Sequence, residues 1–233
     1  MKPETWAAPA VLIFALAFAA SPLIVPDFGG FDPQAFPIPQ DTPPVQPAGY
    51  AFAIWGVIFL WLVIGAGYGV VARRATPDWT AMRVPLALSL AVGAVWLPVA
   101  TISPVWATIL IWAMLLPALA ALNAAPREAA WAAAWPVGLY AGWLSAASCV
   151  AIGLLLGGYG ILSEITAAYL MVGVAIALAF AVMWRLARAP TYGVAAIWAF
   201  IAVAVQNGFA GVGILALIGA VLLLVPTLRA ARG

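Results

Sequence analysis

The chain has 233 residues, of which 67% are apolar and 7% are charged, and its mean hydropathy is +1.14. Soluble domains average roughly 45–50% apolar and 25% charged residues, so this composition excludes an ordinary soluble fold and indicates an integral membrane protein. The net charge of +2 gives no support for nucleic-acid binding, and the lipid bilayer is the expected partner.

Six apolar runs without charged residues are each long enough to cross a bilayer as a helix, which takes about 20 residues. The first run could also be a secretory signal, but its length is closer to that of a span, so we expect a retained helix. The runs are residues 6–25, 49–71, 84–102, 105–122, 130–156 and 165–184.

The last apolar run, residues 192–225, is too long for one span. A single helix over it would extend about 51 Å, whereas the bilayer core is about 30 Å thick. Gln206, Asn207 and Gly208 form a polar turn signal inside the run. The sequence therefore predicts two short spans here, and an all-α, polytopic transmembrane bundle of about eight helices.

All nine basic residues fall on one side of the membrane in this layout. By the positive-inside rule this side is cytoplasmic, together with both termini. The nine are Lys2, Arg73, Arg74, Arg83, Arg127, Arg185, Arg188, Arg229 and Arg232.

No ionisable side chain is predicted to lie well inside a span. Glu164, at the outer start of the sixth helix, is the nearest, and we expect a solvated carboxylate there. Acid–base catalysis and ion-coupled pumping are therefore not expected. The chain lacks histidine and has one cysteine, Cys149, expected to be a small buried residue, so a disulfide within the chain and common zinc sites are excluded.

The one long loop, residues 26–48, contains seven of the nineteen prolines and no Lys or Arg. Such a loop is extended and semi-rigid. We expect an exported connector, and the alternative is a lid over a cavity on the outer face.

Three pairs of glycines, each spaced four residues apart, allow helices to approach closely in a membrane. Internal packing is the favoured interpretation, and dimerisation is the alternative. The pairs are Gly65 and Gly69, Gly138 and Gly142, and Gly153 and Gly157.

Tryptophan is the most distinctive residue type, with twelve copies. Six of them lie near span ends or in loops and are expected to be interfacial anchors: Trp6, Trp79, Trp106, Trp131, Trp135 and Trp184. Trp55 and Trp112 lie deeper in their predicted helices, where an indole can stack on a flat hydrophobic ligand.

Four stretches resemble the TspO/MBR family of tryptophan-rich sensory and translocator proteins, in the family's order. Residues 43–60 read PPVQPAGYAFAIWGVIFL, and AVGAVWLPV follows with Trp96. The third stretch is ILIWAMLLPAL with Trp112, and the fourth is WPVGLYAGWLSAAS with Tyr140, Trp143 and Ala147.

The resemblance implies a TspO-like five-helix bundle over residues 1–156 and three additional transmembrane helices over residues 157–233. It also implies a bundle interior that binds porphyrins, sterol-like molecules and other hydrophobic ligands, with no required cofactor and a tetrapyrrole as a candidate ligand. The ligand-facing residues carried over by position are Trp55, Trp96, Trp112, Tyr140, Trp143 and Ala147. The chain departs from the family where an Asn of the third helix is replaced around Gly93, and where the Asn ending the fifth-helix motif is absent.

The leading hypothesis is a sensor-like protein of the cell membrane, in the family's setting a bacterial inner membrane, that binds a flat hydrophobic molecule such as a porphyrin. The alternatives are a facilitator of hydrophobic or neutral solutes and an accessory subunit of a larger membrane complex, and a homodimer is a further partner. An enzyme is not expected, since without paired ionisable groups it would depend on the ligand's own photochemistry.

Overall fold

A computed structural model describes residues 3–25, 28–186 and 189–232, so Lys2, Arg188 and the first two residues of loop 26–48 lie outside the described part. This part contains eight α-helices and no strand, which confirms the predicted all-α, polytopic bundle. The helices are α1 (Pro3–Ala20), α2 (Ile54–Ala72), α3 (Pro77–Ala100), α4 (Pro104–Ala124), α5 (Ala134–Gly158), α6 (Glu164–Arg185), α7 (Pro190–Gln206) and α8 (Val212–Arg232).

The last apolar run turns back where the polar residues predicted it. Helix α7 ends at Gln206, and Gly208 follows with a φ of +59°, a conformation that glycine adopts at little cost. Seven helices of the described part are long and apolar enough to cross a membrane, and α7, with 17 residues, is the shorter apolar helix. The predicted turn between two helices in residues 192–225 is therefore confirmed, and α8 is the one of the two that is long enough to be a candidate span.

Helix starts differ from the predictions where proline takes part. Helix α3 begins at Pro77, seven residues before the predicted start, because proline suits the first turn of a helix. Helix α1 ends at Ala20, and a short 3-10 turn that contains Pro22, Ser21–Leu23, replaces its predicted last turn. Another 3-10 turn, Gly49–Ala53, precedes α2.

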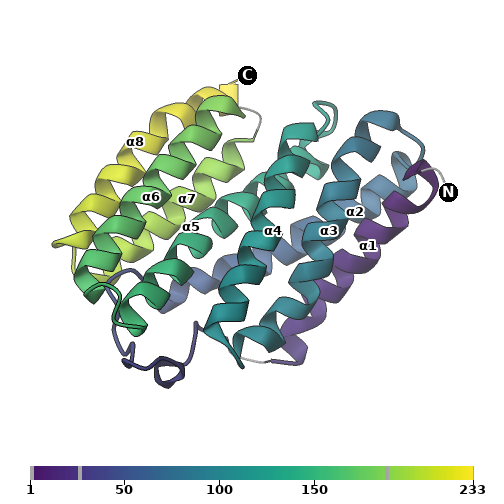
Figure 1. Ribbon diagram of the computed structural model, residues 1–233. Coiled ribbons are helices and arrows are strands. Elements are labelled where there is room, and N and C mark those ends of the chain that lie inside the picture. The colour runs from purple at the N-terminus through teal and green to yellow at the C-terminus, as the bar shows by residue number, and fades with distance from the viewer. Residues whose placement is uncertain (1–2, 26–27, 187–188, 233) are drawn as a thin grey trace.

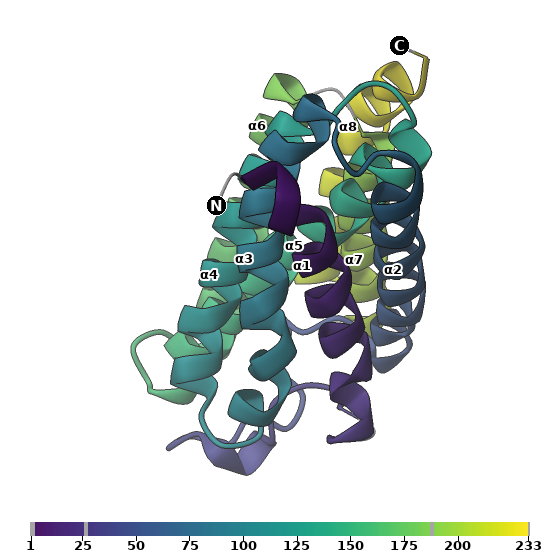
Figure 2. The same cartoon turned by 90° about the vertical axis from the view of Figure 1, so that its right-hand side faces the viewer.

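The helices form two groups that share α5 (Figure 1). In the first group α1 lies between α2 and α3 (Figure 2), and α3 contacts α4, which contacts α5. A few contacts between α2 and α5 close this ring. In the second group α6 and α7 both contact α5, and α8 covers them. Helix α5 is thus a wall of both groups.

Helix α5 is apolar on all sides, as a helix buried on all sides should be. Of its span, 72% is buried inside the protein, whereas the other six spans are 28–50% buried. Its glycines make this possible. A Cβ on Gly142 would collide with the carbonyl oxygen of Tyr192 on α7, and one on Gly138 would meet Ala189 and Thr191.

The other two glycine pairs also serve contacts within the chain. A Cβ on Gly65 would collide with the carbonyl of Ala132, and one on Gly153 would meet Val45 of the long loop. These contacts agree with the internal-packing interpretation of all three pairs, because lipid does not drive helices together and close backbone approach must do so.

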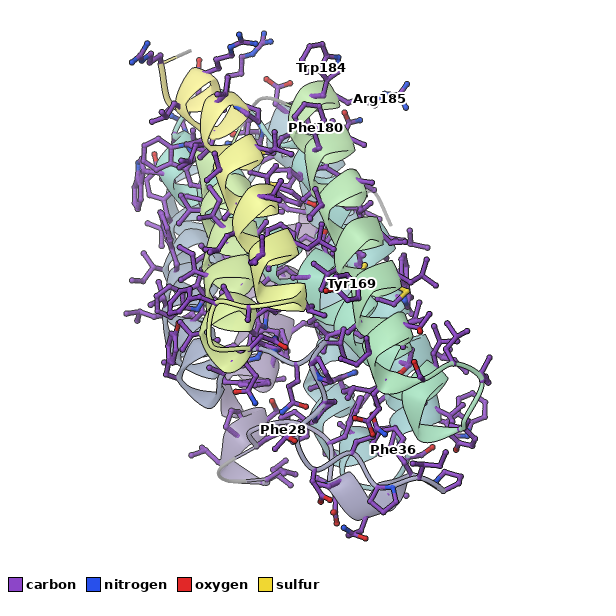
Figure 3. The ribbon with its side chains drawn as sticks, turned by 90° about the vertical axis from the view of Figure 1, so that its left-hand side faces the viewer. Phe28, Phe36, Tyr169, Phe180, Trp184 and Arg185 are labelled. Carbon is purple, nitrogen blue, oxygen red and sulfur yellow. The ribbon has the colours of Figure 1, made fainter. Side chains whose placement is uncertain are left out.

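The two ends of the bundle differ in charge. One end, which we name the basic end, carries helix termini and connections with Arg73, Arg74, Arg127, Arg185, Arg229 and Arg232. The opposite end, the loop end, carries the described part of loop 26–48. Figure 3 shows Trp184 and Arg185 at one end of the molecule and Phe28 and Phe36 at the other. Both described chain ends lie at the basic end (Figure 1), which the positive-inside rule assigns to the cytoplasm.

Arg83 lies inside a helix, although the predicted span began one residue after it. It is in the second turn of α3 and is 2% exposed. Its guanidinium donates hydrogen bonds to the carbonyl oxygens of Gly69 (2.7 Å), Arg73 (2.9 Å) and Arg74 (3.1 Å). Because the last carbonyls of a helix lack partners within it, Arg83 caps the C-terminal end of α2.

Trp79 corrects a second prediction. It was expected to be an interfacial anchor, but it is only 2% exposed, and the guanidinium carbon of Arg83 lies 5.4 Å from its ring centroid. A cation over an indole face is attracted by the ring. Trp106 and Trp184 are 62% and 68% exposed, as anchors should be.

Candidate functional site: an aromatic cavity at the loop end

A cavity of about 70 Å³ lies beside the half of α5 that is nearest the loop end. Residues of both helix groups line the cavity. Trp96 of α3 and Ile111 of α4 lie on one side, and α6 and α7 contribute the other side. The contributing residues of α6 and α7 are Met171, Val172, Ala175, Ala199, Phe200 and Val203.

The long loop supplies the rest of the wall. Its contributing residues are Phe28, Gly30, Phe31, Val45, Gln46 and Pro47, and Phe52 follows from the turn before α2. From α5 come Trp143, Ala146, Ala147, Cys149, Val150, Ala151 and Leu154. The surface is almost entirely apolar, so it favours a hydrophobic molecule over an ion.

A groove of about 220 Å³ lies next to the cavity, between the loop-side ends of α1 and α2. Phe28, Phe52 and Trp96 line both spaces and therefore separate them. Trp55 and Phe59 of α2 and Phe18 of α1 line the groove alone. Displacement of the three shared aromatic side chains would join the two spaces.

Trp55, Tyr140 and Trp143, three of the residues that the family resemblance gives as ligand-facing, lie together. The Trp55 ring centroid is 6.2 Å from that of Trp143 and 6.4 Å from that of Tyr140. Phe59 stacks on Trp55 at 5.3 Å. These rings form one aromatic cluster, in which Trp143 lines the cavity and Trp55 and Phe59 line the groove. The Trp55–Trp143 pair is edge-to-face and the Trp55–Phe59 pair is stacked, two arrangements that aromatic pairs prefer.

Trp96 and Tyr140 already have hydrogen-bond partners. The indole N–H of Trp96 donates to the carbonyl of Ala107 at 2.9 Å. The Tyr140 hydroxyl lies 2.9 Å from the Ser89 hydroxyl, which donates to the carbonyl of Met114 at 2.7 Å. Tyr140 is fully buried and lines neither the cavity nor the groove, so its geometry suits support of the cluster.

Trp112 is separate from the other predicted site residues. It is half-buried on α4 and belongs to the wall of neither space. Its indole nitrogen is buried and has no hydrogen-bond acceptor within the described ranges. The structure thus places Trp96, Trp143 and Ala147 on the cavity, Trp55 and Trp96 on the groove, and Trp112 on neither.

The long loop is fastened over the cavity by the second helix group. The Asn207 side chain donates to the carbonyl of Pro44 at 2.9 Å, and the Ala48 amide donates to the carbonyl of Ala202 at 3.1 Å. The Trp198 indole donates at 3.0 Å to the carbonyl of Ala51, in the turn that follows the loop. These contacts place the loop as a cover of the cavity.

Glu164 takes part in the same fastening and is not the freely solvated carboxylate that we expected. It is half-buried, and its carboxylate accepts a hydrogen bond from the side chain of Gln40 at 3.2 Å. Gln40 itself is 4% exposed, and the Ile38 amide donates to the carbonyl of Gly158 at 2.9 Å. The loop therefore also contacts the ends of α5 and α6.

Several wall residues were missed by the sequence analysis. Phe28 and Phe31 could have been found, because two aromatic residues in a proline-rich loop suggest a buried contact. Met171 and Phe200 carry no such signal, since apolar residues fill every span of this chain. Within the described residues, no group of three or more His, Cys, Asp or Glu side chains could hold a metal ion.

Comparison with known proteins gives one match. No curated protein and no solved structure matches the chain. A family model described as TSPO-like protein matches residues 39–229, from within the long loop to near the end of α8. This match covers well over half of the 233 residues and includes all of α6 and α7. The chain therefore belongs to the TSPO-like protein family, the relationship that its tryptophan-containing stretches predicted.

Proposed function

We propose that this membrane protein is a sensor-like receptor that binds a hydrophobic small molecule in the aromatic cavity at the loop end. The observation that carries the proposal is the cavity itself, which is apolar, lined by Trp96 and Trp143, and covered by a fastened loop. A largely apolar pocket with a few polar groups is the usual form of a ligand site.

The size of the cavity suggests how a flat molecule would fit. Pockets for drug-sized ligands measure roughly 300–1,000 Å³, whereas the cavity measures about 70 Å³ and the groove about 220 Å³. A tetrapyrrole, the ligand class implied by the family resemblance, would occupy both spaces after Phe28, Phe52 and Trp96 move apart. In this arrangement Trp55, Trp96, Trp143 and Ala147 contact the ligand, and Tyr140 positions the cluster.

Titration of protoporphyrin into the full chain in lipid nanodiscs, followed by tryptophan fluorescence, tests the proposal. Ala147→Leu fills part of the cavity, so we expect the apparent Kd to rise about tenfold or more, a penalty of the size that overpacking produces. Ala120→Leu is the matched control, because Ala120 is an exposed position on α4.

Two tryptophan variants define the extent of the site. Trp55→Ala removes a wall of the groove and is expected to weaken binding, whereas Trp112→Ala is expected to change it little. If protoporphyrin and smaller hydrophobic probes all bind the Ala147→Leu and Trp55→Ala variants as tightly as the unchanged protein, the ligand does not bind at the cavity and groove, and the proposed site is contradicted.

Facilitated passage of a hydrophobic solute is the second candidate, favoured by the groove that adjoins the cavity. A continuous route would also need space toward the basic end, where a cavity beside Arg83 measures about 20 Å³. We therefore expect binding without flux when the protein is reconstituted in liposomes. Solute flux that Ala147→Leu abolishes would favour the facilitator instead.

A further inference from the structure

The second helix group carries only positive charge at the basic end. Residues 165–233 contain four arginines and no Asp or Glu. Three of the arginines are in the described part, Arg185 in the last turn of α6, and Arg229 and Arg232 in the last turn of α8. All three are exposed, and none forms an ion pair with a carboxylate of the described ranges. The group therefore presents cations to its surroundings without counter-charges of its own.

The first helix group differs at the same end, because carboxylates accompany its arginines. Glu128 lies 3.7 Å from the guanidinium of Arg73, and a surface groove brings Asp78 and Glu128 together with Arg127. The positive-inside rule accounts for the arginines of both groups, but Asp and Glu contribute little to it. The rule thus does not explain why the second group lacks carboxylates, and an anion from outside the chain is the counter-charge that fits.

The arginines of α6 and α8 lie at the same level of the membrane. The two helices run in the same direction and touch where Gly219 of α8 meets Ile176 of α6. Arg185 follows Ile176 by nine residues and Arg229 follows Gly219 by ten, which places them about 14 Å and 15 Å beyond this contact at about 1.5 Å per residue. We name Arg185, Arg229 and Arg232 the arginine rim.

An exposed aromatic pair adjoins the arginine rim on α6. The ring centroids of Phe180 and Trp184 stack at 6.0 Å, and the two side chains are 39% and 68% exposed. They lead along the last turns of α6 to Arg185 (Figure 3). Tryptophan prefers the headgroup level of a bilayer. An anion that contacts both the ring pair and Arg185 needs an apolar part beside its charge, which a soluble phosphate lacks and a lipid has.

We propose that the arginine rim binds the phosphate headgroups of anionic glycerophospholipids, with an acyl chain against Phe180 and Trp184. Arginine pairs strongly with phosphate because its planar guanidinium donates two parallel hydrogen bonds. Arg229 and Arg232 are three residues apart on one helix, so their side chains are neighbours and can share one phosphate. The proposal concerns the lipid-facing surface of the second helix group and is independent of the ligand cavity.

Quenching of Trp184 by brominated lipids tests the proposal. The full chain is reconstituted in phosphatidylcholine vesicles that contain a fixed fraction of dibrominated lipid, either phosphatidylglycerol or phosphatidylcholine. Bromine quenches tryptophan fluorescence on contact, and the difference between the unchanged protein and Trp184→Phe isolates the signal of Trp184. Both leaflets carry the same lipids, so the orientation of the inserted chain does not affect the comparison.

We expect brominated phosphatidylglycerol to be enriched about fivefold over phosphatidylcholine around Trp184, the size of effect that one basic residue has beside an anionic surface. Replacement of the whole rim, by Arg185→Gln, Arg229→Gln and Arg232→Gln together, should remove the enrichment. The matched control combines Arg74→Gln and Arg127→Gln, two exposed arginines of the first group, and should keep it. In about 1 M KCl, where the Debye length is about 3 Å, the enrichment around the unchanged protein should also fall.

Three results would overturn the proposal. Equal quenching of Trp184 by the two brominated lipids would show that the unchanged protein does not select the anionic one. An enrichment that persists in the triple glutamine variant would show that the arginine rim is not the site. An enrichment that excess inorganic phosphate removes at constant ionic strength would show that the rim selects a soluble anion instead of a lipid.

Discussion

Several single residues in this protein join helices by contacting the backbone of a neighbouring helix. Arg83 is the clearest case, since one buried guanidinium binds three carbonyl oxygens at the end of α2. The sequence shows a basic residue near the expected membrane surface, in agreement with the positive-inside rule. It does not show that the same side chain joins α3 to α2.

Arg83→Ala is expected to lower the free energy of unfolding by about 3 kcal/mol, because hydrogen bonds from a charged donor are lost and carbonyls are left without partners. Arg83→Lys should give an intermediate loss, since an ammonium group cannot reproduce the planar fork of a guanidinium. Thermal unfolding in detergent, followed by circular dichroism, measures the effect. Arg74→Ala, at an exposed side chain, is the control, and equal melting temperatures for both alanine variants would contradict the capping role.

Gly142 is a second residue of this kind, since it lets α7 approach α5 closely. Gly142→Ala places a methyl group against the carbonyl of Tyr192, so we expect a loss of stability of about 1–3 kcal/mol from overpacking. Gly173→Ala on α6 is the matched control, because no atom lies within 4 Å of its added Cβ. It should raise stability by up to about 1 kcal/mol through helix propensity.

Chemical denaturation of the two glycine variants in the same detergent gives the comparison. If Gly142→Ala is as stable as Gly173→Ala, α5 and α7 can move apart with no loss of unfolding free energy, and the close approach at Gly142 does not stabilise the fold.

At the scale of elements, the long loop behaves as part of the second helix group. Its hydrogen-bond partners Ala202 and Asn207 lie on α7 or just after it, and Trp198 of α7 binds the turn that follows the loop. The prolines of the loop limit the number of conformations it can adopt. From the sequence we expected an exported connector, with a lid as the alternative. In the structure the loop contacts α7 and supplies residues of the cavity wall, as a lid would.

Asn207→Ala removes the side-chain bond to Pro44 and should loosen the loop without unfolding the bundle. We expect hydrogen exchange in peptides that contain the Ala48 amide to rise roughly fivefold, which corresponds to about 1 kcal/mol. Gln206→Ala changes the exposed neighbouring side chain and should leave exchange unchanged. Unaltered exchange in Asn207→Ala would show that the loop is held by its other contacts alone.

On the scale of the whole molecule, the two helix groups share one wall, and the cavity belongs to both. Because α5 is the wall, residues of α6 and α7 face the same space as Trp96 of α3. The division into a five-helix bundle and three additional helices therefore describes the order of helices along the chain, and the candidate site spans the division.

Topology can be tested on the intact protein in cells. In a Cys149→Ala background, Gln34→Cys at the loop end should react with an impermeant maleimide added outside. Arg127→Cys at the basic end should react only after the membrane is opened, because the positive-inside rule places the basic end in the cytoplasm. Both positions are exposed. The opposite labelling pattern would reverse the orientation.

The sequence by itself determined the membrane class, the eight helices, the turn at Gln206–Gly208 and the clustering of the basic residues at one end. These properties follow from the cost of moving each segment into lipid, which depends on its own residues. Only the tertiary structure decided that Trp143 lines the cavity and Trp112 does not, and that Met171 and Phe200 also line it. It also decided that α7 packs against α5 at Gly142. An apolar side chain has a similar free energy against lipid and against another helix, so hydropathy does not predict which helices contact each other. Those contacts are determined by how well the helix surfaces pack together.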